Sequence, residues 1–115
     1  MQMYLNGGYY GGYRYFQEST IALFSGCAFC ELQNRRGLGF DRKQLGDGPG
    51  PSCTCASEQS YGHTGFTGTM VWIDPKEQLL YIFLSNRTYP DAENWKLSKL
   101  DVRTNIQEYI YDALN

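Results

Sequence analysis

The sequence has little charge of either sign, and that charge is scattered along the chain. Ten Lys and Arg residues stand against 12 Asp and Glu residues, which gives a net charge of -2. No basic run is present that could release counterions from a phosphate backbone, so we expect no nucleic acid partner. No apolar run approaches the roughly 20 residues that cross a bilayer, and no basic and apolar leader opens the chain. The sequence therefore predicts a soluble segment without a membrane span or a signal.

The start of the chain indicates that the segment comes from a longer protein. Residues 1–5 run directly into Asn6, Gly7 and Gly8, a pattern typical of a last helical turn followed by a glycine stop. This helix has an end in the sequence but no beginning. We therefore expect upstream polypeptide, and the missing leader then says nothing about the compartment of the parent protein.

The composition is that of a globular chain, with 42% hydrophobic and 16% aromatic residues in a length of 115 residues, which suits one small domain. Residues 9–16 place five aromatic side chains around two glycines and predict a tight hairpin. A carbohydrate-binding aromatic platform is the alternative use of this stretch. Ser19 is expected to cap a short helix over residues 20–24, which Gly26 ends.

The central part of the chain predicts an antiparallel sheet. Residues 35–41 could form a strand in which glycines allow close backbone approach, and residues 46–60 are rich in loop-forming types. Two β-prone runs, 69–74 and 79–86, are separated by the turn-forming residues 75–78, which predicts a hairpin. The second run is apolar on both faces, so we expect it to be central in its sheet.

The last part of the chain predicts a helix that covers this sheet. Its apolar residues lie at spacings that form one stripe over about five helical turns. The stripe consists of Leu97, Leu100, Ile106, Ile110, Ala113 and Leu114. The sequence therefore predicts an α+β fold, an antiparallel β-sheet packed by a C-terminal helix. The expected single partial domain spans residues 1–115: a helical and turn lead-in at 1–34, strands at 35–87 and the helix at 91–114.

Residues 63–68, His-Thr-Gly-Phe-Thr-Gly, are the stretch that carries most chemical information. A histidine, a hydroxyl and a glycine stand together where a loop enters a strand, so their polar groups would be displayed at the mouth of that strand. Nucleophilic acyl transfer needs such groups: a backbone N–H for the oxyanion, a hydroxyl for the substrate and a basic or cationic side chain. The pattern therefore indicates a candidate acyl-transfer site.

Around this stretch, the chain resembles the C-terminal part of serine β-lactamase-like hydrolases, which include penicillin-binding D-alanyl carboxypeptidases and esterase-like members. Their third catalytic motif reads K-T-G in many members and H-T-G in many esterase-like ones. The segments similar to this family are residues 62–69, 71–75, 83–87, the Arg-Gly-Leu-Gly-Phe run at 36–40 and residues 87–90. The resemblance implies a fragment of the β-lactamase/transpeptidase-like fold.

The resemblance also implies roles for four neighbouring residues. His63 would take the place of the basic residue of the motif, and Thr64 would offer its hydroxyl to the substrate. Gly65 would let the acyl group approach, and Phe66 would lend its backbone N–H to the oxyanion hole. Taken alone, His63 is better explained as a loop histidine satisfied by a neighbouring backbone group, and only the whole ordered pattern favours the site. Asp91 and Asn94 could line the rim of the pocket or cap helices; we expect no cofactor and no metal at the site.

The nucleophile of the family, the serine of S-x-x-K, is missing from this sequence, because no serine has a lysine three residues later. The string Tyr4-Leu5-Asn6 matches the Y-x-N element only formally, since it lies too close to residues 63–65. We therefore expect the chain alone to be inactive and the missing N-terminal half of its own domain to supply the serine. The parent would be a periplasmic or cell-envelope hydrolase that acts on a small-molecule or peptide substrate. A non-catalytic module that binds cell-wall peptide, sugar or protein is the alternative, and the fragment could form a homodimer.

The four cysteines form the patterns C-x-x-C and C-x-C, at Cys27, Cys30, Cys53 and Cys55. Four thiolates could hold zinc, although the tight C-x-C spacing disfavours it. A disulfide between the two loops and the absence of any shared role are the other interpretations. A disulfide would agree with the extracytoplasmic location that the resemblance implies.

Overall fold

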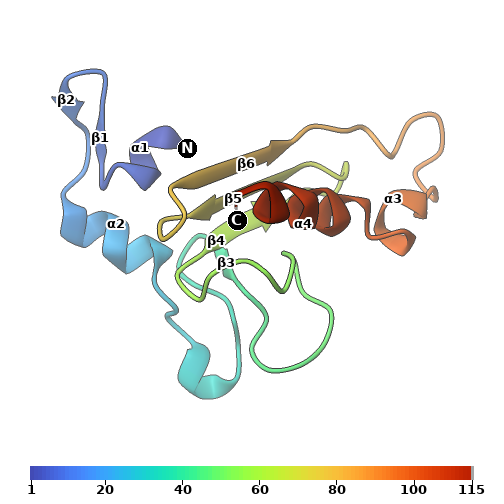
Figure 1. Cartoon of the computed structure of the whole chain (residues 1–115), viewed down its shortest axis with the longest axis horizontal. Coiled ribbons are helices and arrows are strands. Elements are labelled where there is room, and N and C mark those ends of the chain that lie inside the picture. The colour runs from blue at the N-terminus through green and yellow to red at the C-terminus, as the bar shows by residue number, and fades with distance from the viewer. Residues whose placement is uncertain (115) are drawn as a thin grey trace.

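The computed structural model describes residues 1–114 of the chain. Its central feature is a four-stranded antiparallel sheet that the C-terminal helix covers on one face (Figure 1). The strands lie in the order β3-β4-β5-β6. The sheet and helix bounds are Asp41–Arg42 for β3, Tyr61–Thr64 for β4, Met70–Asp74 for β5, Leu79–Phe83 for β6 and Val102–Leu114 for α4. This arrangement confirms the predicted α+β class.

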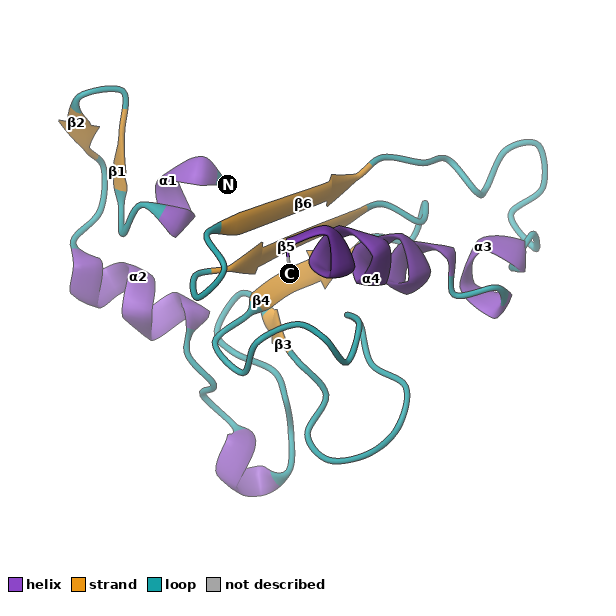
Figure 2. Ribbon diagram, in the orientation of Figure 1, coloured by secondary structure: helices purple, strands orange, loops and turns teal. Residues whose placement is uncertain are grey.

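The first third of the chain forms short elements beside the sheet, and Figure 2 shows its hairpin projecting away from the other elements. The bounds are Gln2–Leu5 for α1, Tyr9–Tyr10 for β1, Tyr13–Arg14 for β2, Glu18–Ser25 for α2 and Cys30–Leu32 for the short 3-10 helix η1. The predicted helix end and hairpin are confirmed, and Gly7 has the left-handed φ of 62° expected of a stop. The predicted cap is wrong, because Ser19 lies inside α2 and Gln17 precedes the helix, whereas Gly26 ends it as predicted.

The core lies between α4 and one face of the sheet. The register pairs Trp72 with Tyr81, and Met70 two residues away shares their face. These three side chains form one buried cluster, against which Ile110 of α4 packs. Burial of a side chain as large as Trp72 contributes on the order of 2–3 kcal/mol. A second buried cluster holds the helix through Tyr111, which packs with Cys53 and Ala56.

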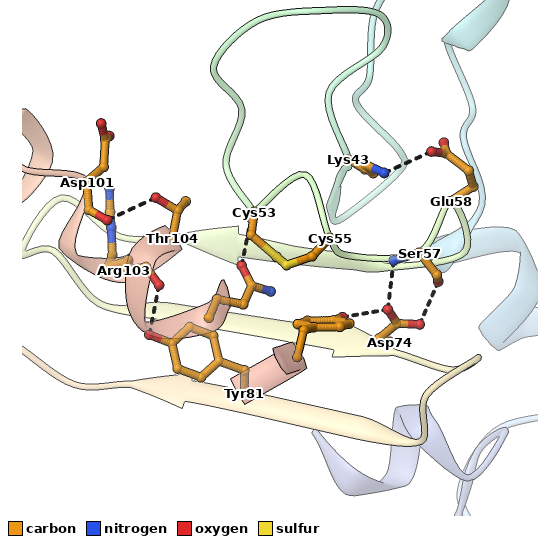
Figure 3. Close-up of a disulfide and its surroundings, with 12 residues drawn as sticks. Lys43, Cys53, Cys55, Ser57, Glu58, Asp74, Tyr81, Asp101, Arg103 and Thr104 are labelled. Atoms are coloured by element: carbon orange, nitrogen blue, oxygen red, sulfur yellow. Dashed lines mark hydrogen bonds and ion pairs between the residues drawn. A yellow bond between two sulfur atoms is a disulfide. The ribbon is translucent and has the colours of Figure 1, made fainter. Parts of the chain in front are cut away.

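Polar contacts fix the position of α4 on this face. The Tyr81 hydroxyl donates to the carbonyl of Arg103 at 3.1 Å (Figure 3), and the backbone N–H of Cys53 donates to Gln107 Oε1 at 2.9 Å. The predicted single stripe is wrong in two respects. The helix is interrupted at Asp101, whose φ is 49°, which leaves a separate α3 at Lys96–Lys99. The fully buried positions of α4 are Gln107 and Tyr111, not the apolar residues of the stripe.

The opposite face of the sheet is covered over only part of its area. Tyr61, which pairs with Ile73, is buried there, and its ring packs against Phe40 with centroids 5.1 Å apart. The residues two positions further along the same face, His63 on β4 and Ile82 on β6, are no longer covered by other side chains. Ile82 lies on the same face and is 50% exposed. The sheet therefore has an apolar area on this face that no described residue buries.

Two strand predictions were wrong. Residues 37–40 form a turn, in which the Gly37 N–H donates to the Phe40 carbonyl at 2.8 Å, and Arg36 bridges to Asp41 across it. Only the two residues of β3 remain extended. The strand β6 lies at the edge of the sheet rather than at its centre, since β5 is its only strand neighbour among residues 1–114. Its apolar outer face is left partly exposed. The predicted hairpin of β5 and β6 is confirmed, with partners Asp74 and Leu79 at its turn.

The cysteines pair within each motif. Cys27 is joined to Cys30, and Cys53 to Cys55, so the alternative of a disulfide between the two loops is wrong. The short spacing places each pair of Cα atoms 5.5 and 5.2 Å apart, within the range for a disulfide. In residues 1–114 no helix has the length and apolar character required to cross a membrane.

Candidate active site

The candidate site lies at the end of β4, where the strand extends beyond its short neighbour. The two residues of β3 pair only with Tyr61 and Gly62. On the other side, the Gly65 N–H donates to the Thr69 carbonyl at 2.8 Å, which fixes the alternation of the ladder. The peptide groups of Thr64 therefore point away from β5. Beyond Gly62, this edge of β4 therefore has no strand partner among residues 1–114, and the Thr64 carbonyl on it contacts the His63 ring.

His63 lies on the partly uncovered face of the sheet and not in a packed core. It pairs with Val71, which in turn pairs with Ile82, and the His63 side chain is exposed. Its Nδ1 lies 2.7 Å from the Thr64 carbonyl oxygen, and its Nε2 lies 3.3 Å from Arg36 Nη1. A carbonyl can only accept and a guanidinium can only donate. Both contacts are therefore satisfied by a neutral imidazole with its hydrogen on Nδ1.

Arg36 is held beside His63 by a buried carboxylate. Asp41 is 2% exposed, and its Oδ1 lies 2.8 Å from Arg36 Nη1 while its Oδ2 lies 3.0 Å from Arg35 Nη1. Burial and the neighbouring Tyr4 hydroxyl raise the pKa of Tyr61, and Arg42 lowers it by less. The resulting pKa of about 12 keeps this phenol neutral. Two guanidinium groups against one carboxylate leave this corner of the site with a positive charge in excess.

Thr64 and Gly65 follow His63 in the stretch and have close neighbours. Thr64 is opposite Met70 and points to the face that α4 covers, although it remains half-buried rather than enclosed. A Cβ on Gly65 would collide with the Thr69 hydroxyl. Gly65 therefore has a local packing reason to be glycine, in addition to the substrate approach expected from the sequence.

Phe66 begins the turn between β4 and β5 and is fixed by an arginine. Its ring is 69% exposed and lies edge-on to Trp95, with centroids 6.4 Å apart. The Arg87 guanidinium carbon lies 4.6 Å from the Phe66 centroid and 3.8 Å from the Trp95 centroid. No hydrogen bond between described residues uses the Phe66 N–H. The Phe66 N–H is thus a backbone donor without a partner among the described residues. It lies on a turn whose Phe66 side chain packs against Trp95 and Arg87.

Arg87 joins this turn to the chain that follows β6. It is 7% exposed, its backbone N–H donates to the Thr67 carbonyl at 2.9 Å, and its Nη1 donates to the carbonyls of Ala92 and Asn94 at 2.9 and 3.1 Å. A cation between two aromatic rings is stabilised by about 0.5–2 kcal/mol. Arg87 therefore restricts the position of residues 66–68.

Two further residues named from the sequence serve local turns. Asp91 Oδ1 accepts from the Glu93 N–H at 2.9 Å, and Asn94 Oδ1 accepts from the N–H of Lys96, the first residue of α3, at 3.2 Å. The structure thus brings together His63, Thr64, Gly65 and Phe66, as their adjacency requires. Sequence reasoning assigned no role to Arg36, whose contact with His63 spans 27 positions and follows no local pattern.

Comparisons with known proteins identify the family to which the chain is similar. A family model described as Beta-lactamase matches residues 22–103. Relatives named "Putative D-alanyl-D-alanine carboxypeptidase" from Salmonella enteritidis PT4, Salmonella newport and Salmonella dublin are each 35% identical over 98 residues. Each match covers 85% of this chain but 22% of the relative. The chain therefore spans about a fifth of the length of the curated relatives that it matches.

Proposed function

The chain belongs to the beta-lactamase family, and from that premise we propose that it forms one wall of the active site of a serine hydrolase. The observation that supports this proposal best is the edge of β4 that lacks a strand partner among residues 1–114. This edge displays the His63-Thr64-Gly65 stretch beside the Phe66 N–H, which no described residue accepts. The nucleophilic serine belongs to polypeptide that is not in this sequence, and residues 1–115 form part of one domain of the longer protein.

The proposed reaction is hydrolysis through an acyl-enzyme. The serine attacks the carbonyl carbon of an amide or ester, the leaving group departs, and water then releases the acyl group. The Phe66 N–H donates to the developing oxyanion, a contact whose loss costs about 10² to 10³ in rate at comparable sites. The Thr64 hydroxyl and the exposed edge of β4 align the substrate. The neutral ring of His63 accepts a hydrogen bond from the Arg36 guanidinium at the rim of the site.

The substrate class follows from the relatives rather than from the fold. Their printed name describes carboxypeptidases for D-alanyl-D-alanine, and we extend this specificity to the parent of the present chain. A peptide that ends in a free carboxylate suits the excess positive charge at Arg35, Arg36 and Asp41. β-Lactams and esters are the other acyl donors of this proposal, and the cell envelope is the compartment in which such peptides occur.

A non-catalytic binding module is the second candidate, and one observation favours it. Both ring nitrogens of His63 have protein partners, so this side chain is not free to accept a proton from a substrate or a serine. The two candidates differ in the upstream sequence of the longer protein. An S-x-x-K motif there supports the hydrolase, and an altered motif supports the binding module.

Acylation of the longer protein tests the proposal. Fluorescent penicillin is expected to label a serine outside residues 1–115, located by mass spectrometry of the labelled peptide. Thr64→Val should slow acylation about fivefold to tenfold, because a hydrogen bond of about 1 kcal/mol is lost. Thr54→Val, in the loop before β4, is the matched control and should label at the original rate. Equal rates for all three proteins, or a label within residues 1–115, would reject the proposed wall.

A further inference from the structure

We propose that Arg103 of α4 is a positioning residue of this site, because its guanidinium holds the turn that carries the Phe66 N–H. The inference rests on the proposed function, in which this N–H donates to the oxyanion. Arg103 has no contact with the substrate in this proposal and acts through the backbone of residues 65–68. The position of α4 on the sheet thereby becomes a condition for acylation.

The geometry of the turn leaves the Phe66 N–H free. The Gly68 N–H donates to the Gly65 carbonyl at 2.9 Å, which closes a β-turn with Phe66 and Thr67 at its centre. The N–H of the second residue of such a turn takes no part in the closing bond. This bond fixes the shape of the turn but not its position in the molecule. The direction of the Phe66 N–H is therefore set by the contacts that hold the turn from outside.

The first of these contacts come from the end of β6. The Thr67 carbonyl accepts from the Arg87 N–H at 2.9 Å and from the Ser85 hydroxyl at 3.1 Å. The Phe66 ring packs against the Arg87 guanidinium, 4.6 Å from its centroid. Both central residues of the turn are thus held by residues that lie about 20 positions later in the chain.

Arg103 holds the last residue of the turn from α4. Its Nη1 donates to the Gly68 carbonyl at 3.3 Å, across 35 positions of the chain. Its own carbonyl accepts from the Tyr81 hydroxyl at 3.1 Å (Figure 3), and the Tyr81 ring belongs to a buried cluster of the core. Arg103 is therefore anchored to the core through its backbone and to the turn through its side chain, so it transmits the position of α4 to Gly68.

Gly68 has little room to move away from this contact. Its φ is 91°, and a Cβ there would lie 2.6 Å from the Ser85 hydroxyl oxygen and 3.3 Å from Leu97 Cδ1. The turn is thus closely packed as well as hydrogen-bonded. A donor to a developing negative charge acts best when it is already in place, because no reorganisation is then needed during the reaction.

The Arg103 side chain is half-buried and remains a charged donor. Burial lowers the pKa of its guanidinium and the neighbouring Arg87 lowers it further, whereas Tyr81 and Asp101 raise it. The ordinary pKa of arginine is so high that the group stays protonated at neutral pH. A lysine at this position would keep a charged donor, and a methionine would keep only the aliphatic stem. These two replacements separate the contact with Gly68 from the packing of the side chain.

Nitrogen-15 relaxation of the 115-residue chain tests the assignment without requiring turnover. The amide order parameter of Phe66 should be about 0.85 in the original chain and should fall below about 0.6 in Arg103→Met. Arg103→Lys should recover most of this loss. Lys99→Met is the matched control, because it removes an exposed positive charge from α3 with a similar change in helix propensity, and it should leave Phe66 rigid. A rigid Phe66 amide in Arg103→Met would overturn the proposal.

A measurement on the original chain keeps the test decisive where a variant does not fold. Nuclear Overhauser contacts are expected between the Arg103 guanidinium protons and the α-protons of Gly68. Their absence from a well-dispersed spectrum of the original chain would also overturn the proposal.

The rate of acylation of the longer protein by penicillin separates positioning from a merely structural role. A displaced donor is less harmful than a missing one, which costs about 10² to 10³ in rate, so Arg103→Met should lower the rate constant about tenfold. The half-saturating penicillin concentration should stay unchanged, and Arg103→Lys should restore most of the rate. A merely structural role would reduce the labelled fraction and leave the rate constant of the labelled molecules as it was.

The two measurements also separate this inference from the proposed function. Normal acylation in Arg103→Met, or an equal loss of rate in Lys99→Met, would reject the positioning role and leave the hydrolase in place. Absence of labelling in the original longer protein would reject the hydrolase, and the order parameter of Phe66 would still decide whether Arg103 holds the turn.

Discussion

The hydroxyl of Tyr111 donates a hydrogen bond of 2.5 Å to Asp74 Oδ2, although 37 residues separate the two. Asp74 also accepts from the Ser57 hydroxyl at 2.6 Å and from the Ser57 N–H at 2.8 Å (Figure 3). One buried carboxylate therefore joins α4, the end of β5 and the loop before β4. The junction thereby restrains the loop that leads into β4.

Loss of the Tyr111 hydroxyl should destabilise the fold by about 1–3 kcal/mol, because Asp74 would keep its burial and lose a donor. Tyr111→Phe is the variant, and urea unfolding followed by circular dichroism is the measurement. Tyr109→Phe, on the exposed side of α4, is the matched control and should unfold like the original chain. Equal stability of the two variants would mean that the hydrogen bond to Asp74 contributes nothing.

Acid should unfold the chain through Asp74. Burial raises the pKa of this carboxyl, but hydrogen bonds from Ser57, Tyr111 and the Glu77 N–H outweigh burial and place the pKa below its usual range. A lowered folded pKa stabilises the fold above the unfolded value of about 3.9, and this stabilisation is lost as the pH falls through the folded pKa. Ser57→Ala removes the hydroxyl donor to the carboxylate, while the backbone N–H of residue 57 remains, and should move acid unfolding to higher pH. Ser19→Ala should leave the acid transition where it was, and a common transition for both variants would contradict the role of Asp74.

Gly62 in β4 should not tolerate a side chain. A Cβ at this position would collide with the Val71 carbonyl and the Trp72 ring, and neither the backbone nor the packed indole can move away freely. Gly62→Ala should cost about 1–3 kcal/mol through overpacking. Gly39→Ala, where the nearest atom would be 3.7 Å away, is the control and should be close to neutral. Thermal unfolding distinguishes them, and a Gly62→Ala chain as stable as the Gly39→Ala chain would refute the close approach of β4 and β5.

The uncovered face of the sheet should cause self-association of the isolated chain. Ile82 and Leu84 are exposed on the edge strand and just after it, and such apolar surface promotes association when it is left open. Ile82→Lys should reduce the association measured by sedimentation. Leu32→Lys, at an apolar residue of η1 that is more exposed than Ile82, should not. A monomeric original chain would contradict this expectation.

The sequence predicted the elements whose signal is local. Two β-prone apolar runs on either side of residues 75–78 define the β5–β6 hairpin, because both strands and their turn lie within the 14 residues 70–83. Glycines after Leu5 and Ser25 end two helices for a similarly local reason.

Features that depend on distant neighbours were not predictable in this way. The two apolar faces of β6 were attributed to a central strand, but a sequence pattern reports burial of faces and not hydrogen bonding of edges. The glycines at 37 and 39 suit a turn as well as a strand, and the Arg36–Asp41 bridge decides between them. The left-handed Asp101 interrupts the final helix without any proline or glycine to signal it. Cysteine spacing alone could not select pairing within each motif over pairing between loops.

The same limit applies to the candidate site. The His-Thr-Gly stretch and its display at a strand end followed from adjacent residues, and the structure shows His63 exposed on the sheet rather than in a core. Arg36 and Arg87 reach the stretch from remote positions, and only the coordinates reveal that they contact His63 and Phe66.

The most direct test of the account is covalent labelling of the 115-residue chain beside the longer protein, with a fluorescent penicillin and a fluorophosphonate. The account predicts that the longer protein is labelled once per molecule and that the 115-residue chain is not labelled by either reagent, because its wall of the site contains no nucleophilic serine. Stoichiometric labelling of the 115-residue chain would contradict the account.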